Sequence, residues 1–206
     1  RARSMRHSPL QDTALWVEKY APSKSADLVV APKKVREAQA WIEEAFIPGH
    51  SKFIVLVGSP GVGKSAMVQC LAKELKLQVI EWSESFSGTW QTPSFQSSIS
   101  YESPISSFET FLQQNAIGYQ ALPLREERSS RNRSLLVIQD LPYCHGVEAQ
   151  SRLREALTNF VQASDVPTVL IFSDVVEGKH RPSDLEQLID ARVLYSQFVR
   201  IMTVAG

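Results

Sequence analysis

The sequence predicts an α/β fold with a mostly parallel sheet flanked by helices, and three observations lead to it. Short unbroken apolar runs occupy residues 53–57, 135–138 and 168–172, and such runs are typical of strands buried on both faces of a parallel sheet. Stretches with apolar residues at helical spacing separate these runs. A glycine-rich loop joins the first run directly to one of the helical stretches. Regular alternation of this kind indicates a doubly wound domain.

The chain before the first strand divides into three parts. Residues 1–13 are polar and basic without periodicity, which predicts a disordered basic arm. Residues 14–32 contain WVEKYAP and then an apolar patch, Leu28 to Val30, that Pro22 and Pro32 flank, so we expect an extended segment laid on the core. Residues 33–46 place apolar side chains at i, i+3 and i+7, the spacing of an amphipathic helix, which Pro48 and Gly49 end.

The middle of the chain begins regularly and then changes character. We expect a strand at 53–57, a helix at 65–75 and a second strand at 77–82. Residues 83–133 are rich in serine and poor in aliphatic side chains, so they form an insert. Only 105–122 has a helical pattern within it.

The last predicted elements restore the alternation. The apolar runs 135–138 and 168–172 are predicted strands, and residues 147–161 between them carry one apolar helical face. No internal repeat is present. We therefore predict one α/β domain over 14–206, interrupted by the insert.

Composition and charge exclude several classes of protein. The chain has 22 Lys and Arg against 22 Asp and Glu, so no overall basic field favours binding of nucleic acid to the chain alone. Cys70 and Cys144 are too few and too far apart for a disulfide framework or a CxxC metal site. The longest apolar run is far shorter than the roughly 20 residues of a membrane span. We expect an intracellular protein with no membrane partner.

The strongest chemical signal is the segment from Gly58 to Ser65, GSPGVGKS, which fits the phosphate-loop pattern GxxxxGK[ST] between a strand and a helix. Its glycines allow backbone N–H groups to close around a β-phosphate. The helix that follows directs its positive end at the same anion. The Lys64 ammonium would reach the β- and γ-oxygens, and the Ser65 hydroxyl would ligate Mg²⁺. The predicted nucleotide-binding residues of this loop are Pro60, Gly61, Val62, Gly63, Lys64, Ser65 and Ala66.

A second candidate position is Asp140, which follows the apolar run 135–138. Ligands bind at the carboxyl edge of open α/β sheets, where a carboxylate could complete a magnesium shell and orient a water molecule. We therefore predict Asp140 as a catalytic and metal-site residue. The alternative is that Asp140 only caps a turn. Sites that hydrolyse nucleotides usually have an acidic residue next to the metal at the position of Gln139. The sequence therefore supports nucleotide binding more strongly than hydrolysis.

The strand predicted at 168–172 also ends in polar residues, Ser173 and Asp174. In this fold a polar side chain there can contact a γ-phosphate or the attacking water. A plain turn is the other interpretation, and the residues alone leave both open.

Three segments together resemble the AAA+ clamp-loader subunits of the replication factor C type. These segments are WVEKYAP at 16–22, GSPGVGKS at 58–65 and IQDLP at 138–142. QVIEW at 78–82, IQDLP and FSD at 172–174 are similar in particular to the replication-factor-C-like large subunit of the DNA-damage checkpoint clamp loader. The resemblance covers about residues 15–175.

This resemblance implies a P-loop NTPase base domain of the AAA+ type that binds ATP and Mg²⁺. Asp140 would stand in the Walker B position. Arg192 lies near the place where such subunits offer an arginine to a neighbour's nucleotide, although a solvated helix-end arginine fits it better. The chain would be an N-terminal fragment that ends at Gly206 with its lid domain absent. The residues implied to enclose the adenine are Val17, Tyr20, Pro22 and the apolar patch Leu28, Val29 and Val30.

The same resemblance implies a function in the nucleus. The chain would be an ATP-binding subunit of a clamp loader that places a checkpoint sliding clamp on DNA in response to damage. ATP would act as a conformational switch, with weak or partner-dependent ATPase activity at most. The implied partners are small replication factor C-type subunits, the sliding clamp and, through the assembled complex, DNA.

Two other functions remain open at this point. A stand-alone P-loop nucleotide kinase would need a mobile lid with several arginines, which the run REERSSRNR at 125–133 could supply. A hydrolysis-deficient P-loop scaffold would keep the fold without turnover, and Gln139 favours it.

Overall fold

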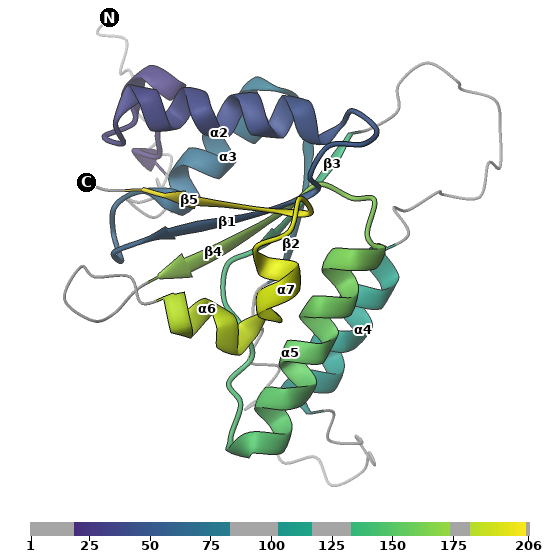
Figure 1. The fold of residues 1–206 in the computed structure, drawn as a ribbon. Helices are drawn as coiled ribbons and strands as arrows, with labels where there is room; N and C mark the ends of the chain where they lie inside the picture. The colour runs from purple at the N-terminus through teal and green to yellow at the C-terminus, as the bar shows by residue number, and fades with distance from the viewer. Residues whose placement is uncertain (1–18, 83–102, 117–132, 174–181, 205–206) are drawn as a thin grey trace, which may run out of the picture.

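The computed structural model describes residues 19–82, 103–116, 133–173 and 182–204 (Figure 1). The predicted basic arm, Val17 and most of the serine-rich insert lie outside these residues. The strands are β1 Phe53–Gly58, β2 Gln78–Trp82, β3 Ser134–Ile138, β4 Thr168–Ser173 and β5 Val199–Thr203. The helices are η1 Ser25–Asp27, α2 Pro32–Ala45, α3 Lys64–Glu74, α4 Pro104–Ala116, α5 Gly146–Ala163, α6 Pro182–Leu188 and α7 Ala191–Leu194.

The strands form one five-stranded sheet in the order β2-β3-β4-β1-β5, and every pairing in it is parallel. Strand β1 lies between β4 and β5, and all six of its residues are buried. An unbroken apolar strand is therefore found where both faces of the sheet are covered. The predicted α/β fold with a parallel sheet flanked by helices is confirmed.

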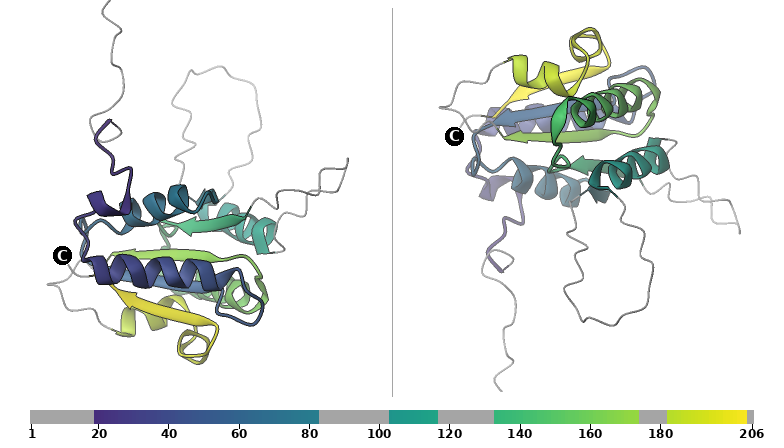
Figure 2. Two further views of the ribbon diagram at one scale, coloured as in Figure 1. Left: turned by 90° about the horizontal axis from the view of Figure 1, so that it is seen from above. Right: turned by 90° about the horizontal axis from the view of Figure 1, so that it is seen from below.

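Helices cover both faces of this sheet. In Figure 1, α2 and α3 lie above the strands and α4 to α7 lie below them, and Figure 2 shows the two layers from either side. Each layer has its own core. Leu71 of α3 packs with Val137 and Val169 on one face, and Leu157 of α5 packs with Leu136 and Leu170 on the other. Neighbouring residues of a strand thus serve opposite layers, as the two-residue period of a strand requires.

The segment before α2 corrects one prediction. Residues 14–32 were expected to be extended, but the described part contains the 3-10 turn η1. Two contacts hold it: the Lys24 backbone N–H donates to the Asp27 carboxylate at 3.3 Å, and the Ser25 backbone N–H donates to Glu74 Oε1 at 2.7 Å. The second contact ties the segment to the end of α3. Short polar residues favour such local bonds over an extended chain.

Helix α4 confirms the helix predicted inside the insert, from Pro104 to Ala116, whereas 117–122 lie outside the described residues. Trp82 at the end of β2 holds this helix. Its ring lies 5.0 Å from the rings of Phe108 and Phe111, measured between centroids. Arg152 of α5 also binds the Glu109 carboxylate of α4 through two nitrogens. The insert therefore contributes to the core below the sheet.

The two cysteines occupy unlike environments, and neither forms a disulfide. Cys70 in α3 is 1 % exposed, and burial raises the pKa of its thiol. Cys144 is half-buried. Since the thiolate is the reactive form, we expect a thiol reagent to modify Cys144 at least roughly ten times faster than Cys70 in the folded chain. Mass spectrometry of a time course checks this, and equal rates that persist in folded protein contradict the burial of Cys70.

Candidate nucleotide-binding site

The glycine-rich loop connects β1 to α3 and has the geometry of an anion cradle. Gly61 and Gly63 have φ angles of 82° and 92°, which side-chain-bearing residues rarely adopt. Gly63 is the N-cap of α3, so the loop ends where the first backbone N–H groups of the helix lack partners within it. A phosphate placed there meets these N–H groups and the positive end of the helix.

Lys64 is folded into this loop. Its side chain is 4 % exposed, and its ammonium nitrogen donates to the carbonyl oxygens of Gly58 at 2.8 Å and Ser59 at 2.9 Å. An ammonium group has three N–H donors. The bonds among the described residues use two of them, so the third remains for a ligand oxygen. Burial lowers the pKa of Lys64. Within the described ranges this buried cation has no anionic partner, so a phosphate group would stabilise it.

Beside the loop lies a pocket of about 810 Å³. It brings together residues far apart in the sequence, namely the loop and the segment before α2. Its size suits a small-molecule ligand. The predicted residues that line it are Tyr20, Pro22, Val29, Val30, Pro60, Gly61, Val62, Gly63 and Ala66. Leu28, from the apolar patch that the resemblance implies at the adenine, also lines it, and sequence reasoning did not name three others as ligand-site residues: Ala21, Ser23 and Asp27.

The predicted apolar residues before α2 differ in exposure. Val30 is 3 % exposed and belongs to the core, whereas Val29 is 97 % exposed and Tyr20 65 %. Val30 also supports the loop, since a Cβ placed on Gly63 would lie only 3.2 Å from its Cγ2. The pocket therefore has a rigid floor at Val30 and an exposed rim.

Ser173 lies at the carboxyl end of β4, where its register partner is Gly58, the first residue of the loop. This places Ser173 one strand away from the loop, about 4.8 Å in a sheet. Its side chain is exposed. The predicted closeness of Ser173 to the phosphate loop is thus reproduced by the backbone, while contact with a ligand stays a prediction.

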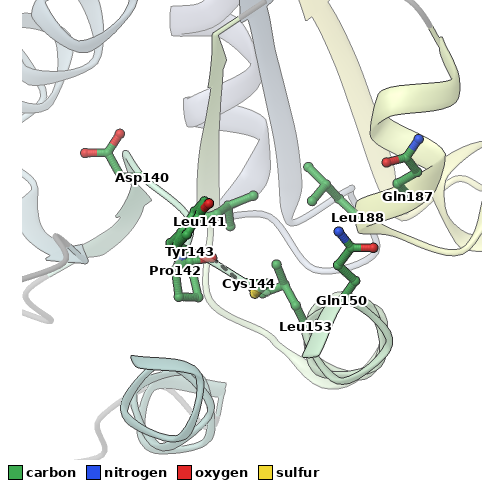
Figure 3. A pocket seen from close by; sticks show the side chains of 9 residues that line it. All are labelled: Asp140, Leu141, Pro142, Tyr143, Cys144, Gln150, Leu153, Gln187 and Leu188. Carbon is green, nitrogen blue, oxygen red and sulfur yellow. Dashed lines mark hydrogen bonds between the residues drawn. The ribbon is translucent and has the colours of Figure 1, made fainter. Parts of the chain in front are cut away.

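Asp140 follows β3, which is separated from β1 by β4. Its side chain is exposed and lines a different pocket, of about 580 Å³. Figure 3 shows that the carboxylate lies apart from Gln150 and Gln187 on the far side of this pocket. Asp140 is therefore at the predicted edge of the sheet, but two strands from the loop. Among the described residues, no group of three or more His, Cys, Asp or Glu forms a metal site by itself.

Gln139 has a partner that the sequence did not indicate. Its side-chain amide Nε2 donates a hydrogen bond to the carboxylate of Glu81, on the neighbouring strand β2.

Arg192 is exposed in the short helix α7, where its backbone N–H donates to Asp190, and it does not line the pocket beside the loop. Its interpretation as a helix-end arginine fits this position.

A comparison with known protein families shows which family the chain belongs to. The family model of the Rad17 P-loop domain matches residues 9–183. This span includes the phosphate loop, the carboxyl ends of β3 and β4, and the segment before α2. The chain belongs to the Rad17 P-loop domain family. This P-loop NTPase membership confirms the resemblance to checkpoint and replication clamp-loader proteins drawn from the motifs.

Curated checkpoint and replication proteins match the chain over different shares of its length. Cell cycle checkpoint protein RAD17 of Homo sapiens is 28% identical over 182 residues, which cover 82% of this chain and 26% of that protein. Checkpoint protein rad17 of Schizosaccharomyces pombe is 43% identical over 68 residues, 33% of this chain and 11% of that protein. The replication factor C large subunit of Thermococcus kodakarensis is 39% identical over 79 residues, 37% of this chain and 16% of that protein. The chain spans about a quarter of the human relative's length.

Proposed function

We propose that this chain is the ATP-binding base domain of a checkpoint clamp-loader subunit. In this function ATP acts as a conformational ligand that favours one state of an assembly. The partners would be small replication factor C-type subunits and a sliding clamp, with DNA met by the assembled complex in the nucleus. Membership of the Rad17 family supports this proposal, and so do the names of its relatives. No helix in the described part of the chain is long and apolar enough to span a membrane.

The residues present fit a magnesium nucleotide. The loop from Gly58 to Ser65 would surround the phosphates, with Lys64 giving its third N–H to a phosphate oxygen. The pocket between the loop and Tyr20 would hold the base. The Ser65 hydroxyl and the Asp140 carboxylate are oxygen donors, the kind that Mg²⁺ prefers; when bound, the ion would neutralise phosphate charge.

One observation is the main support for the nucleotide part of the proposal: Lys64 is buried inside a loop whose Gly61 and Gly63 have positive φ angles. The test is titration of a fluorescent ATP analogue against the 206-residue chain. Saturable binding that strengthens with Mg²⁺ supports the proposal. Absence of binding overturns it, and phosphoryl transfer to a nucleoside monophosphate would favour a kinase instead.

Ser65 gives a sharper prediction within that test. We expect Ser65→Ala to remove most of the strengthening by Mg²⁺, roughly tenfold in affinity, and to leave binding in EDTA nearly unchanged, because only the metal contact is lost. Ser59→Ala, in the same loop with an exposed side chain, is the matched control. Equal magnesium dependence in both variants would contradict the role of the Ser65 hydroxyl.

The partner part of the proposal needs its own experiment. The chain is mixed with the small replication factor C-type subunits of its own organism, and co-elution in gel filtration is measured with and without ATP. Co-elution that Lys64→Met weakens supports a nucleotide-dependent subunit. Failure to associate under either condition overturns the clamp-loader role for this chain, while leaving nucleotide binding to be decided by the titration.

A hydrolysis-deficient P-loop scaffold is the second candidate, and the amide at position 139 favours it. A turnover assay on the assembled complex separates the two functions. Binding without turnover in any assembly supports the scaffold, and partner-stimulated turnover supports the switch.

A further inference from the structure

Glu81 and Gln139 form a pair at the carboxyl edge of the sheet. They come from adjacent parallel strands, in which Glu81 is the register partner of Val137 and Trp82 that of Ile138. The amide Nε2 of Gln139 donates to a carboxylate oxygen of Glu81. The predictions named neither Glu81 nor this contact.

The pair lies on the face of the sheet that α3 covers. Successive side chains of a strand point to opposite faces. Trp82 packs against Phe108 and Phe111 of α4 below the sheet, so the preceding residue, Glu81, is on the face above. Val137 belongs to the core beneath α3, and Gln139 follows it by two residues. The pair is thus on the same side of the sheet as Ser65, in the first turn of α3.

The chemistry of the amide makes this contact directional. An ionised carboxylate only accepts hydrogen bonds, whereas a glutamine amide has one donating end and one accepting end. Glu81 must therefore face the NH₂ group of Gln139, which turns the carbonyl oxygen Oε1 away from β2. No group among the described residues donates to that Oε1. The bond supplies an oriented, unsatisfied oxygen acceptor where a carboxylate is usual.

We propose that Glu81 is a positioning residue for magnesium. By holding the amide of Gln139, it presents Oε1 to the hydration shell of the ion that accompanies the nucleotide, and its own negative charge lies directly behind. A neutral amide backed by a carboxylate then takes the place of the missing acid. Such outer partners commonly fix the orientation of groups near a metal. This inference rests on the proposed nucleotide-binding function.

The test compares nucleotide affinity with and without the metal. The affinity of the 206-residue chain for a fluorescent ATP analogue is measured in Mg²⁺ and in EDTA, and the ratio of the two is the magnesium gain. The variants are Glu81→Ala, which removes the partner, and Glu81→Gln, which keeps a carbonyl acceptor but no charge. Glu44→Ala, an exposed carboxylate on α2, is the matched control.

We expect Glu81→Ala to reduce the magnesium gain by roughly tenfold, with binding in EDTA unchanged. Glu81→Gln should recover part of the gain through its carbonyl, and Glu44→Ala should keep all of it. A Glu81→Ala variant with the wild-type gain overturns the inference. So does an equal loss in Mg²⁺ and in EDTA, because that result means general damage to the site.

A swap variant tests the directionality of the pair. In Gln139→Glu alone, two carboxylates face each other across the strands. Adding Glu81→Gln restores a donor opposite an acceptor and places the charge at 139. We expect the single variant to have a smaller magnesium gain than the double variant, which should reach at least the wild-type gain. The reverse order overturns the inference.

A measurement on the unliganded chain keeps the contact and the proposed function separate. The side-chain NH₂ signals of Gln139, assigned in ¹⁵N spectra with Gln139→Ala, should shift in Glu81→Ala and stay unchanged in Glu44→Ala. Signals that do not move overturn the inference without touching the proposed function. If the signals shift in Glu81→Ala but the wild-type chain binds no nucleotide, the proposed function is overturned, and the metal role of the pair with it.

Discussion

We expect Lys64→Met to abolish stabilisation by Mg·ATP without destabilising the unliganded chain. The ammonium group is buried and bonded only to two loop carbonyls among the described residues, so its charge is costly until a phosphate arrives. Methionine keeps a similar aliphatic volume and removes the charge. In the wild type, ATP at about 100 times its Kd should add about 2.7 kcal/mol, or about 5–10 °C in Tm.

Thermal unfolding of both proteins, with and without Mg·ATP, measures this. Because the pKa of Lys64 is lowered by burial, its penalty is full below that pKa and fades as the pH rises toward the unfolded value. The Tm advantage of Lys64→Met without ligand should therefore shrink at alkaline pH. Lys73→Met, exposed in the last turn of α3, should retain the ligand-dependent shift. A full shift in Lys64→Met would exclude Lys64 from the binding site.

Gly58→Ala should destabilise the fold itself. A Cβ at this position would lie 2.2 Å from the carbonyl oxygen of Val204 and 3.3 Å from its carbonyl carbon. Both atoms belong to the backbone beyond β5, which also bonds to β1 through the Val204 N–H and the Val57 carbonyl. A rotamer change cannot relieve this clash. We expect a loss of about 3 kcal/mol, which corresponds to about 6–12 °C in Tm.

Chemical denaturation of Gly58→Ala beside Gly49→Ala separates the steric cause from the loss of glycine. Gly49 has a φ of 84° with nothing near its added Cβ, so its substitution should cost only about 1 kcal/mol from backbone strain. A Gly58→Ala variant no less stable than Gly49→Ala would show that the strand end can move aside.

The sequence predicts well those elements whose burial is uniform. Strands β1, β3 and β4 are apolar runs because helices cover both of their faces, and α2 and α5 show a clear apolar stripe. Strand β5 was not predicted, since it carries Arg200 on the sheet border and mixes exposed with buried positions. The short helices α6 and α7 were not predicted either, because a helix of one or two turns is too short to show the periodic spacing of apolar residues.

The phosphate loop could be predicted because its chemistry depends on residue types at fixed spacing. Gly61 and Gly63 determine the loop conformation locally, and the motif itself includes the lysine at position 64. The contact between Glu81 and Gln139 could not be predicted, since 58 positions separate the two residues and only the strand order brings them together. The register of Ser173 with Gly58 on the adjacent strand, by contrast, agrees with a position near the phosphate loop that the fold class predicts.

The wall of the pocket beside the phosphate loop contacts both ends of α3. Val30 packs under Gly63 at the start of this helix, and the Ser25 N–H bonds to Glu74 at its end. The 11 residues of α3 extend about 16 Å, so the segment from Ser25 to Val30 is held at two points that lie far apart along this helix. Through these two contacts α3 positions the wall of the pocket relative to the phosphate loop, so one added or deleted helical turn would displace the wall from the loop.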